Sequence, residues 1–381
     1  MRSDETPEAE ARPADEGPFG ALGAELRSLF RAWGDDPGSW PAERFDELAL
    51  RAFELQWNTV PAYRAYCVAR GVHPSTVGDW RDIPPVPTAA FREVDLAVAP
   101  PAEADLVFRT SGTSRGSGRR GRHRVVDPEL YRAALEPAFE RFVLGPGSRP
   151  LVLSLVPPFG RGRDSSLAWM CDDIAARFGA PGSGSVARGG EPEWAEARAL
   201  VQRCVADDVP VCVLGTTLAV DAWVERLEAR GEALRLPEGS VLMDTGGAKG
   251  RPGLRRGAIV ERLGRALGLS PEDVVNEFGM TELLSQRYGR GEAGVGRSPP
   301  LLGPPWLRTR ALDPVSLQPL PEGEAGVLCH LDLANAGSVV CVLTEDMGRM
   351  RGGALESIGR SPGAPPRGCS LATAELLDTL G

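Results

Sequence analysis

Three short stretches carry the residue types that hold a phosphorylated ligand. The first is the SGTS run at 111–114, inside the glycine-, serine- and arginine-rich stretch 108–127. Backbone N–H groups of such a run can converge on one point, and its hydroxyls add donors, so it can cradle phosphate. The Walker pattern G-x-x-x-x-G-K-[ST] is absent, and a flexible connector is an equally good interpretation of this run alone. The nearby arginines either help to hold triphosphate or form a solvated hairpin; they are Arg109, Arg115, Arg119, Arg120, Arg122 and Arg124.

The second stretch is FGMTE at 278–282, which places an aromatic ring, a glycine, a hydroxyl and a carboxylate within five positions. Phe278 can lie against a flat base, Thr281 can donate to a phosphate oxygen, and Glu282 can hold Mg²⁺. The alternative is a strand end that runs into a helix capped by Thr281.

The third stretch is TED at 344–346, where Asp346 follows an apolar strand and precedes a glycine turn. A carboxylate in that place can accept hydrogen bonds from the two vicinal hydroxyls of a ribose. An ordinary aspartate in a β-turn is the alternative, and it is common.

Cys369 is the cysteine whose surroundings favour reactivity. The seven cysteines have no paired spacing, so neither a zinc site nor a disulfide framework is indicated, and reduced cytoplasmic thiols fit best. Cys369 follows a glycine, has Arg367 nearby and stands at the start of a helix expected over 370–377. Helix N-terminal N–H groups and a nearby cation both stabilise a thiolate, so we expect a nucleophile here. The alternative is a bystander cysteine near the C-terminus.

Charge and composition narrow the class of protein. The formal charge of −9 argues against a nucleic-acid binder, and no apolar run approaches the roughly 20 residues that cross a bilayer. Lys249 is the only lysine among 43 basic residues. It either marks a place where a compact ammonium is needed or remains by chance.

Alternating strands and helices must position these residues. Apolar strands are expected at 151–156, 209–215 and 239–247, and amphipathic helices lie between and after them. This alternation predicts an α/β fold whose mostly parallel sheet is covered on both faces. Ligands of such sheets bind at the carboxyl ends of the strands.

The chain divides by composition into four expected parts. Short strands dominate beyond 304, and the first 20 residues carry six acidic side chains, which excludes a signal peptide. The parts are a disordered acidic tail at 1–20, an α/β domain at 21–304, a β-rich subdomain at 305–350 and a C-terminal tail with Cys369 at 351–381.

In their order and separation, the three stretches resemble the motifs of the adenylate-forming (acyl-AMP synthetase, ANL) superfamily. That superfamily's motifs read Ser-Gly-Thr-Thr-Gly, Tyr-Gly-x-Thr-Glu and Thr-Gly-Asp. Within it the chain looks most like the LuxE-type acyl-protein synthetases (long-chain-fatty-acid–luciferin-component ligases). The stretches that carry this likeness are FELQWNTVPAYRAYCVARGVHP, DWRDIPPVPTAAFRE, DTGGAKG and RGCSL, and the resemblance spans roughly 45–375.

The resemblance implies a large α/β domain of the adenylate-forming type plus a small β-rich subdomain, with the usual C-terminal lid domain absent or vestigial. It implies ATP and Mg²⁺ as cofactors. The residues it assigns are Ser111, Gly112, Thr113 and Ser114 to the ATP phosphates, Gly246 and Gly247 to the adenine, Thr281 and Glu282 to the α-phosphate and magnesium, Asp346 to the ribose, Arg360 to the domain hinge and Cys369 to the acyl group.

The chain departs from the superfamily's pattern in two ways. Arg115 occupies a position that is usually glycine in the superfamily, and the superfamily's distal catalytic lysine has no counterpart. Our hypothesis is that Lys249 supplies that cation to the carboxylate or α-phosphate.

The resemblance therefore implies ATP-dependent activation of a carboxylic acid, by family a fatty acid, to acyl-AMP. The acyl group would then pass to Cys369 and on to a partner such as an acyl reductase or another acceptor protein, in the cytoplasm. One alternative is a ligase that delivers the acyl group to coenzyme A or a carrier-protein thiol without a covalent enzyme intermediate. Another is a non-catalytic nucleotide-binding scaffold.

Overall fold

The computed structural model describes residues 18–101, 106–110, 119–160, 164–246, 256–291, 299–360 and 366–379. The predicted phosphate residues Ser111, Gly112, Thr113 and Ser114 lie outside the described residues, and so do Arg115, Gly247 and Lys249. For Arg360 the backbone is described and the side chain is not.

Ten α-helices lie within the described residues, joined by 3-10 turns and one π-helical turn. They are α1 (Pro18–Asp35), α2 (Phe45–Thr59), α3 (Pro61–Ala69), α4 (Ala90–Glu93), α5 (Pro128–Phe139), α6 (Ser166–Phe178), α7 (Trp194–Ala206), α8 (Thr217–Ala229), α9 (Arg256–Leu267) and α10 (Arg367–Asp378).

A six-stranded sheet forms the centre of the α/β part, in the order β11-β10-β9-β8-β4-β5. Its strands are β4 (Leu151–Ser154), β5 (Gly184–Ser185), β8 (Val211–Thr216), β9 (Val241–Thr245), β10 (Val274–Phe278) and β11 (Arg287–Arg290). All its neighbouring strands are parallel except the β10–β11 pair. The predicted α/β class with a mostly parallel sheet is confirmed.

A second sheet has five strands, with the path β1-β14-β13-β12 and β15 paired to β14. Its strands are β1 (Val86–Pro87), β12 (Leu307–Leu312), β13 (Gly326–Asp332), β14 (Cys341–Arg351) and β15 (Ala354–Arg360). Two short antiparallel pairs complete the fold: β2 (Leu106–Arg109) with β3 (Arg122–Val125), and β6 (Ala187–Arg188) with β7 (Glu191–Pro192).

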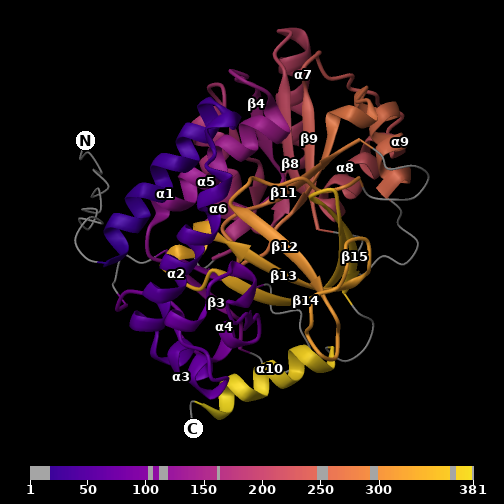
Figure 1. Cartoon of the computed structure of the whole chain (residues 1–381). Coiled ribbons are helices and arrows are strands. Elements are labelled where there is room, and N and C mark those ends of the chain that lie inside the picture. The colour runs from indigo at the N-terminus through magenta and orange to yellow at the C-terminus, as the bar shows by residue number, and fades with distance from the viewer. Residues whose placement is uncertain are drawn as a thin grey trace.

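The two faces of the six-stranded sheet bury different cores because successive strand residues point in opposite directions. Met243 and Val275 belong to the core that includes α1, α5 and α6, whereas Leu242 and Val274 belong to the core that includes α7, α8 and α9. Figure 1 shows α1, α5 and α6 on one side of the sheet and α8 and α9 on the other. Each strand end can therefore present one side chain to each helical layer.

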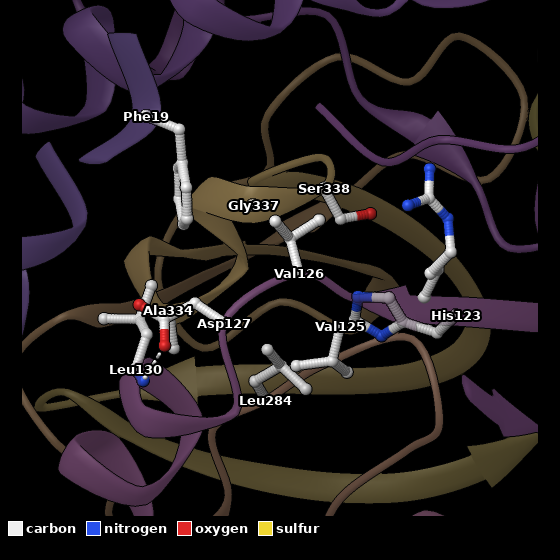
Figure 2. Close-up of a pocket in the computed structure, with 11 residues that line it drawn as sticks. Phe19, His123, Val125, Val126, Asp127, Leu130, Leu284, Ala334, Gly337 and Ser338 are labelled. Atoms are coloured by element: carbon white, nitrogen blue, oxygen red, sulfur yellow. Dashed lines mark hydrogen bonds between the residues drawn. The ribbon is translucent and has the colours of Figure 1, made fainter. Parts of the chain in front are cut away.

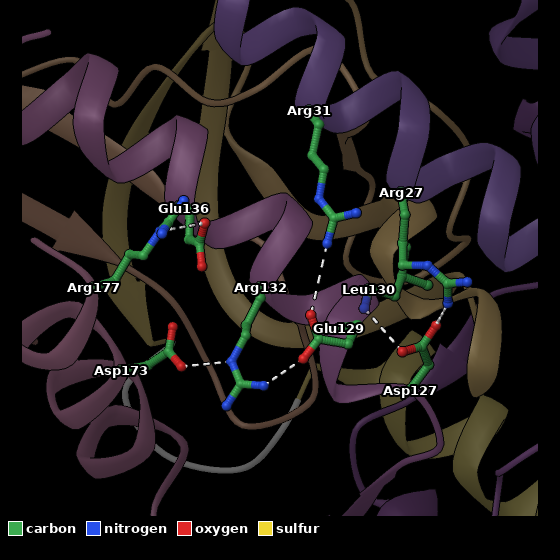
Figure 3. A network of polar contacts seen from close by, with 9 residues as sticks. All are labelled: Arg27, Arg31, Asp127, Glu129, Leu130, Arg132, Glu136, Asp173 and Arg177. Atoms are coloured by element: carbon green, nitrogen blue, oxygen red, sulfur yellow. Dashed lines mark hydrogen bonds and ion pairs between the residues drawn. The ribbon is translucent and has the colours of Figure 1, made fainter. Parts of the chain in front are cut away.

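Helix α5 is held between α1 and α6 by a polar network (Figure 3). Asp127 caps α5 by accepting from Leu130 N at 3.1 Å, with proline at the first helical position, and it pairs with Arg27 of α1. Arg132 of α5 reaches Asp173 of α6 at 2.7 Å. The outer pairs of this network are exposed and contribute little singly, but together they fix the helix that carries Tyr131.

The C-terminal helix α10 packs back on an early part of the chain. It contacts α3, α4, β1 and β14, and Figure 1 shows it in yellow, below α4 and β14. Arg70 at the end of α3 pairs with Glu375 of α10 at 2.6 Å. No helix within the described ranges is long and apolar enough to cross a membrane.

Candidate functional site

A cavity of about 330 Å³ lies at the carboxyl ends of β8, β9 and β10, where a parallel sheet is expected to bind its ligand. The side formed by these strand ends and the turn after them is lined by Thr216, Thr245, Gly246, Glu277, Gly279, Met280, Thr281, Leu283 and Gln286. The opposite side is lined by Arg109, Arg120, Tyr131, Ser165, Ser166, Leu167 and Met170.

Two of the predicted site residues line this cavity, although they come from different stretches of sequence. Gly246 follows β9 with a backbone φ of +82°, a left-handed conformation that favours glycine, and Thr281 lies in the turn after β10. The predicted residues that the structure describes but that do not line the cavity are Phe278, Glu282, Asp346 and Cys369.

Glu277 lines the cavity and was missed by the sequence analysis. Its side chain is 4% exposed, and Thr245, its partner in the β9–β10 register, donates a hydrogen bond to Oε2. Burial, reinforced by the nearby charge of Asp244, raises the pKa of Glu277 to about 7 against the lowering effect of Thr245. The only signal in the sequence was a carboxylate inside the apolar strand VVNEF.

The residues beside Glu277 point to the other face of β10. Asn276 donates through Nδ2 to the carbonyl and carboxylate of Asp244, and Arg256 donates to the same carboxylate at 2.8 Å. Phe278 lies with its ring centroid 5.8 Å from that of His330 and packs on Leu328 and Leu355. The predicted base-stacking ring and Glu277 therefore face opposite sides of the same strand.

The turn after β10 is held by a buried carboxylate on β13. Asp332 accepts from Leu284 N at 3.1 Å and from Ser285 N and Oγ at 2.8 and 2.7 Å. Asn335 accepts from Leu284 N and donates to the backbone carbonyl of Glu282 at 2.8 Å. Burial raises the pKa of Asp332 to about 6 although these hydrogen bonds oppose the shift. The backbone of the FGMTE motif is thus fixed from the second sheet.

His123 of β3 holds the same turn from another side. Its Nδ1 lies 2.8 Å from the carbonyl oxygen of Thr281, and burial lowers the pKa of the ring to about 4. The ring is therefore neutral at neutral pH and donates from Nδ1 to that carbonyl. Figure 2 shows it beside a cavity of about 10 Å³, room for one water at most, with Leu284 and Val125 on the wall.

Cys369 lies in the first turn of α10, and its thiol contacts the predicted ribose motif. Its Sγ donates to the carbonyl oxygen of Thr344 at 3.1 Å, and the residue is 4% exposed. Burial, together with the charge of Glu345, raises the pKa of the thiol to about 12. This direction is opposite to the lowered pKa that the helix start and Arg367 led us to expect, because desolvation outweighs the helix end.

The TED stretch lies on β14 beside the predicted hinge position. Asp346 N donates to Thr344 Oγ1 at 3.1 Å, and Thr344 Oγ1 donates to Leu328 O at 2.9 Å. Asp346 and Arg360 are opposite each other in the β14–β15 register. The residue assigned to the ribose and the residue assigned to the domain hinge are therefore neighbours across this pair of strands.

Within the part of the chain that the structure describes, no group of three or more His, Cys, Asp and Glu side chains could hold a metal ion. Mg²⁺ bound with a nucleotide requires only one or two carboxylates, because the phosphates supply the other oxygens. Glu282 offers one carboxylate beside the cavity, with its backbone fixed by Asn335, but its side chain does not line the cavity.

We predict that Asp332→Ala lowers the free energy of unfolding by about 2–4 kcal/mol, because buried N–H and O–H groups of Leu284 and Ser285 lose an acceptor. Urea unfolding measures the change. Asp332→Asn, which keeps one acceptor, should lose less, and the exposed control Glu324→Ala should stay within about 0.5 kcal/mol of the parent chain. Equal stability of Asp332→Ala and the parent chain would contradict the anchoring role.

We predict that Glu277→Gln becomes more stable relative to the parent chain as pH rises. The folded carboxyl keeps its proton to about pH 7 whereas the unfolded one loses it near pH 4.5, so ionisation destabilises the parent chain between these values. The gain of the variant should reach about 3 kcal/mol at most. Urea unfolding at about pH 5 and about pH 8 measures it, and a gain independent of pH would refute the raised pKa.

Comparisons with known proteins agree with the motifs. The family model "Acyl-protein synthetase, LuxE" matches residues 196–377. The long-chain-fatty-acid–luciferin-component ligase of Vibrio harveyi is 24% identical over 356 residues, which cover 89% of this chain and 90% of the relative. The ligase of the same name from Aliivibrio fischeri is 30% identical over 83 residues, which cover 19% of this chain and 22% of the relative.

Solved structures share the fold. The structure of 2-hydroxyisobutyryl-CoA ligase in complex with 2-HIB-AMP and CoA, in an open conformation, superposes with a TM-score of 0.60 at 17% identity. The match covers 84% of this chain and 70% of that one. In sequence this chain is similar to the LuxE acyl-protein synthetases, and it shares the fold of an acyl-CoA ligase, as its motifs predicted.

Proposed function

We propose that this protein uses ATP to activate a carboxylic acid as acyl-AMP and then carries the acyl group on Cys369. The observation that carries the first half is that Gly246 and Thr281, assigned to the nucleotide from two separate motifs, line one cavity at the strand ends. The likeness to ligases named for fatty-acid and CoA substrates supports acid activation. The resemblance suggests a fatty acid for this chain.

Residues in and beside the cavity carry groups that suit the first half-reaction. A carboxylate oxygen attacks the α-phosphorus of ATP, the bond to the β-phosphate breaks, and pyrophosphate leaves. Arg109 and Arg120 line the cavity, and both are held by Asp164 at 2.9 Å, which orients two guanidinium groups near the place for phosphates. The Thr281 hydroxyl can donate to the α-phosphate. Glu282 would hold Mg²⁺, which neutralises phosphate charge when bound.

The second half-reaction requires the thiol of Cys369. The sulfur attacks the acyl carbon, its proton passes to solvent, the C–S bond forms and the C–O bond to phosphate breaks, which releases AMP. The contact of Sγ with Thr344, two residues from Asp346, supports a place close to the ribose. Because the thiol is buried with a raised pKa, α10 must shift before the thiolate can form. The acyl group would then pass to an acceptor protein such as an acyl reductase.

Burial of the same thiol favours a second candidate. A ligase that delivers the acyl group directly to coenzyme A or a carrier-protein thiol needs no exposed cysteine of its own. In that case Cys369 would only pack α10 against β14, and acyl-CoA would form without labelling of the chain.

We predict that Cys369→Ser abolishes covalent acylation and leaves acyl-AMP formation intact. Intact-mass measurement after incubation with ATP and each of a panel of long- and short-chain acids should show a hydroxylamine-sensitive acyl adduct on the parent chain only. The matched control is Cys204→Ser on α7, a buried cysteine remote from the motifs, which should keep the adduct. A labile adduct that persists in Cys369→Ser, or acyl-CoA formed by an unlabelled parent chain, would overturn the proposed acyl carrier.

We predict that Lys249→Ala slows acyl-AMP formation by about 10²-fold or more, because a cation close to developing phosphate charge is lost. Pyrophosphate release and ATP–pyrophosphate exchange measure this step. Lys249→Arg keeps the charge in a larger shape and should recover part of the rate if charge matters, or none if the compact ammonium is required. Unchanged exchange in Lys249→Ala would reject the role, and no exchange with any acid in the parent chain would indicate a scaffold.

A further inference from the structure

We propose that Glu277 selects the acid: the substrate carries a hydrogen-bond donor, an ammonium or a hydroxyl group, on the part of the molecule remote from its reacting carboxylate, and this donor binds Glu277. The proposal rests on the proposed function and narrows it. It replaces a plain alkyl chain by an amino- or hydroxy-substituted one.

Glu277 is a buried carboxyl group with incomplete hydrogen bonding. Glu277 is 4% exposed and lines the cavity, and the described residues give its side chain one hydrogen bond, from Thr245. Among those residues, no arginine or lysine pairs with it, whereas Asp244 on the other face pairs with Arg256 at 2.8 Å. Buried carboxyl groups are costly unless they are paired or hydrogen-bonded, so a ligand donor would satisfy the remaining acceptor capacity.

The backbone makes room for this carboxyl group. A methyl group added to Gly279 would overlap Glu277 Oε1, so the carboxyl lies directly over the glycine of the FGMTE motif. The turn that carries Gly279 is fixed by His123 and Asp332 on either side. The position of the carboxyl group is therefore built into the fold and does not depend on a flexible surface chain.

Glu277 points away from the residue that is expected to bind the adenine. Phe278, the residue expected to stack on the adenine, points to the opposite side of β10, toward His330. Glu277 and Tyr131 both line the cavity, and burial, together with the charge of Glu277, raises the pKa of that phenol. Leu167, Met170 and Leu283 also line the cavity and can receive apolar carbons. This mixture suits an organic acid with one polar substituent better than a purine or an unbranched hydrocarbon.

The chemistry of recognition follows from these contacts. An ionised Glu277 would accept from an ammonium or a hydroxyl, and an ammonium would also compensate the buried charge. A plain methyl end in the same place would leave the carboxyl without its second partner. A site built to hydrogen-bond a substrate discriminates strongly against the analogue that lacks the donor.

The experiment compares ATP–pyrophosphate exchange by the full chain with matched acids of equal chain length that end in an amino, a hydroxyl or a methyl group. We expect the parent chain to show at least about 10-fold higher kcat/KM with a donor-bearing acid than with its methyl counterpart. Glu277→Met, which is of similar length and apolar, should lose or invert this preference with KM for ATP unchanged. Glu261→Gln, an exposed control on α9, should behave as the parent chain does.

Each outcome decides the proposal. The proposal is supported if the parent chain prefers the acids that end in an amino or a hydroxyl group and Glu277→Met loses this preference. The preferred group then identifies the donor. Preference for the methyl-ended acids overturns it while acid activation stands. An unchanged acid preference with a raised KM for ATP in Glu277→Met also overturns it and assigns the carboxyl to the nucleotide. Absence of exchange with every acid refutes the proposed function, and this proposal with it. Urea unfolding of Glu277→Met and Glu277→Gln separates loss of fold from loss of selectivity.

Discussion

The parallel register of β9 and β10 is the constraint on which the site depends. It places Thr245 opposite Glu277 and Asp244 opposite Asn276, so that two polar pairs form on opposite faces of the sheet. On the α8–α9 side, Asp244 forms an ion pair with Arg256. On the α5–α6 side, Thr245 and Glu277 line the cavity. A slip of one residue would exchange these faces and bury the wrong carboxyl group against the helices.

The second sheet serves the first by holding the turn after β10. Asp332 and Asn335 at the end of β13 bind backbone groups of residues 282–285, and Gln56 of α2 in turn binds the backbone of Asn335 and Val340. Trp306 closes the arrangement by donating to Ser285 Oγ at 3.1 Å. The FGMTE motif is therefore placed by residues that lie far from it in the chain and carry no recognisable motif of their own.

The sequence was sufficient for the fold class, because strand and helix periodicities in residues 127–267 are strong and the motifs resemble one superfamily. It was also sufficient to select Gly246 and Thr281, which line one cavity. It could not identify Glu277, His123 or Asp332, because a single polar residue in an apolar strand looks the same whether it binds a ligand, anchors a turn or satisfies the core. The sequence also could not predict the raised pKa of the Cys369 thiol, since a helix start indicates a lowered pKa only when the thiol is exposed.

The packing of Cys369 against Thr344 protects the thiol from chemical modification. Oxidants and electrophiles react with thiolates at accessible sulfur, and this sulfur is protonated and covered. A cysteine kept in that state is protected from sulfenic acid formation and stray alkylation. The packing of α10 thus keeps the thiol intact for the acyl transfer that we propose.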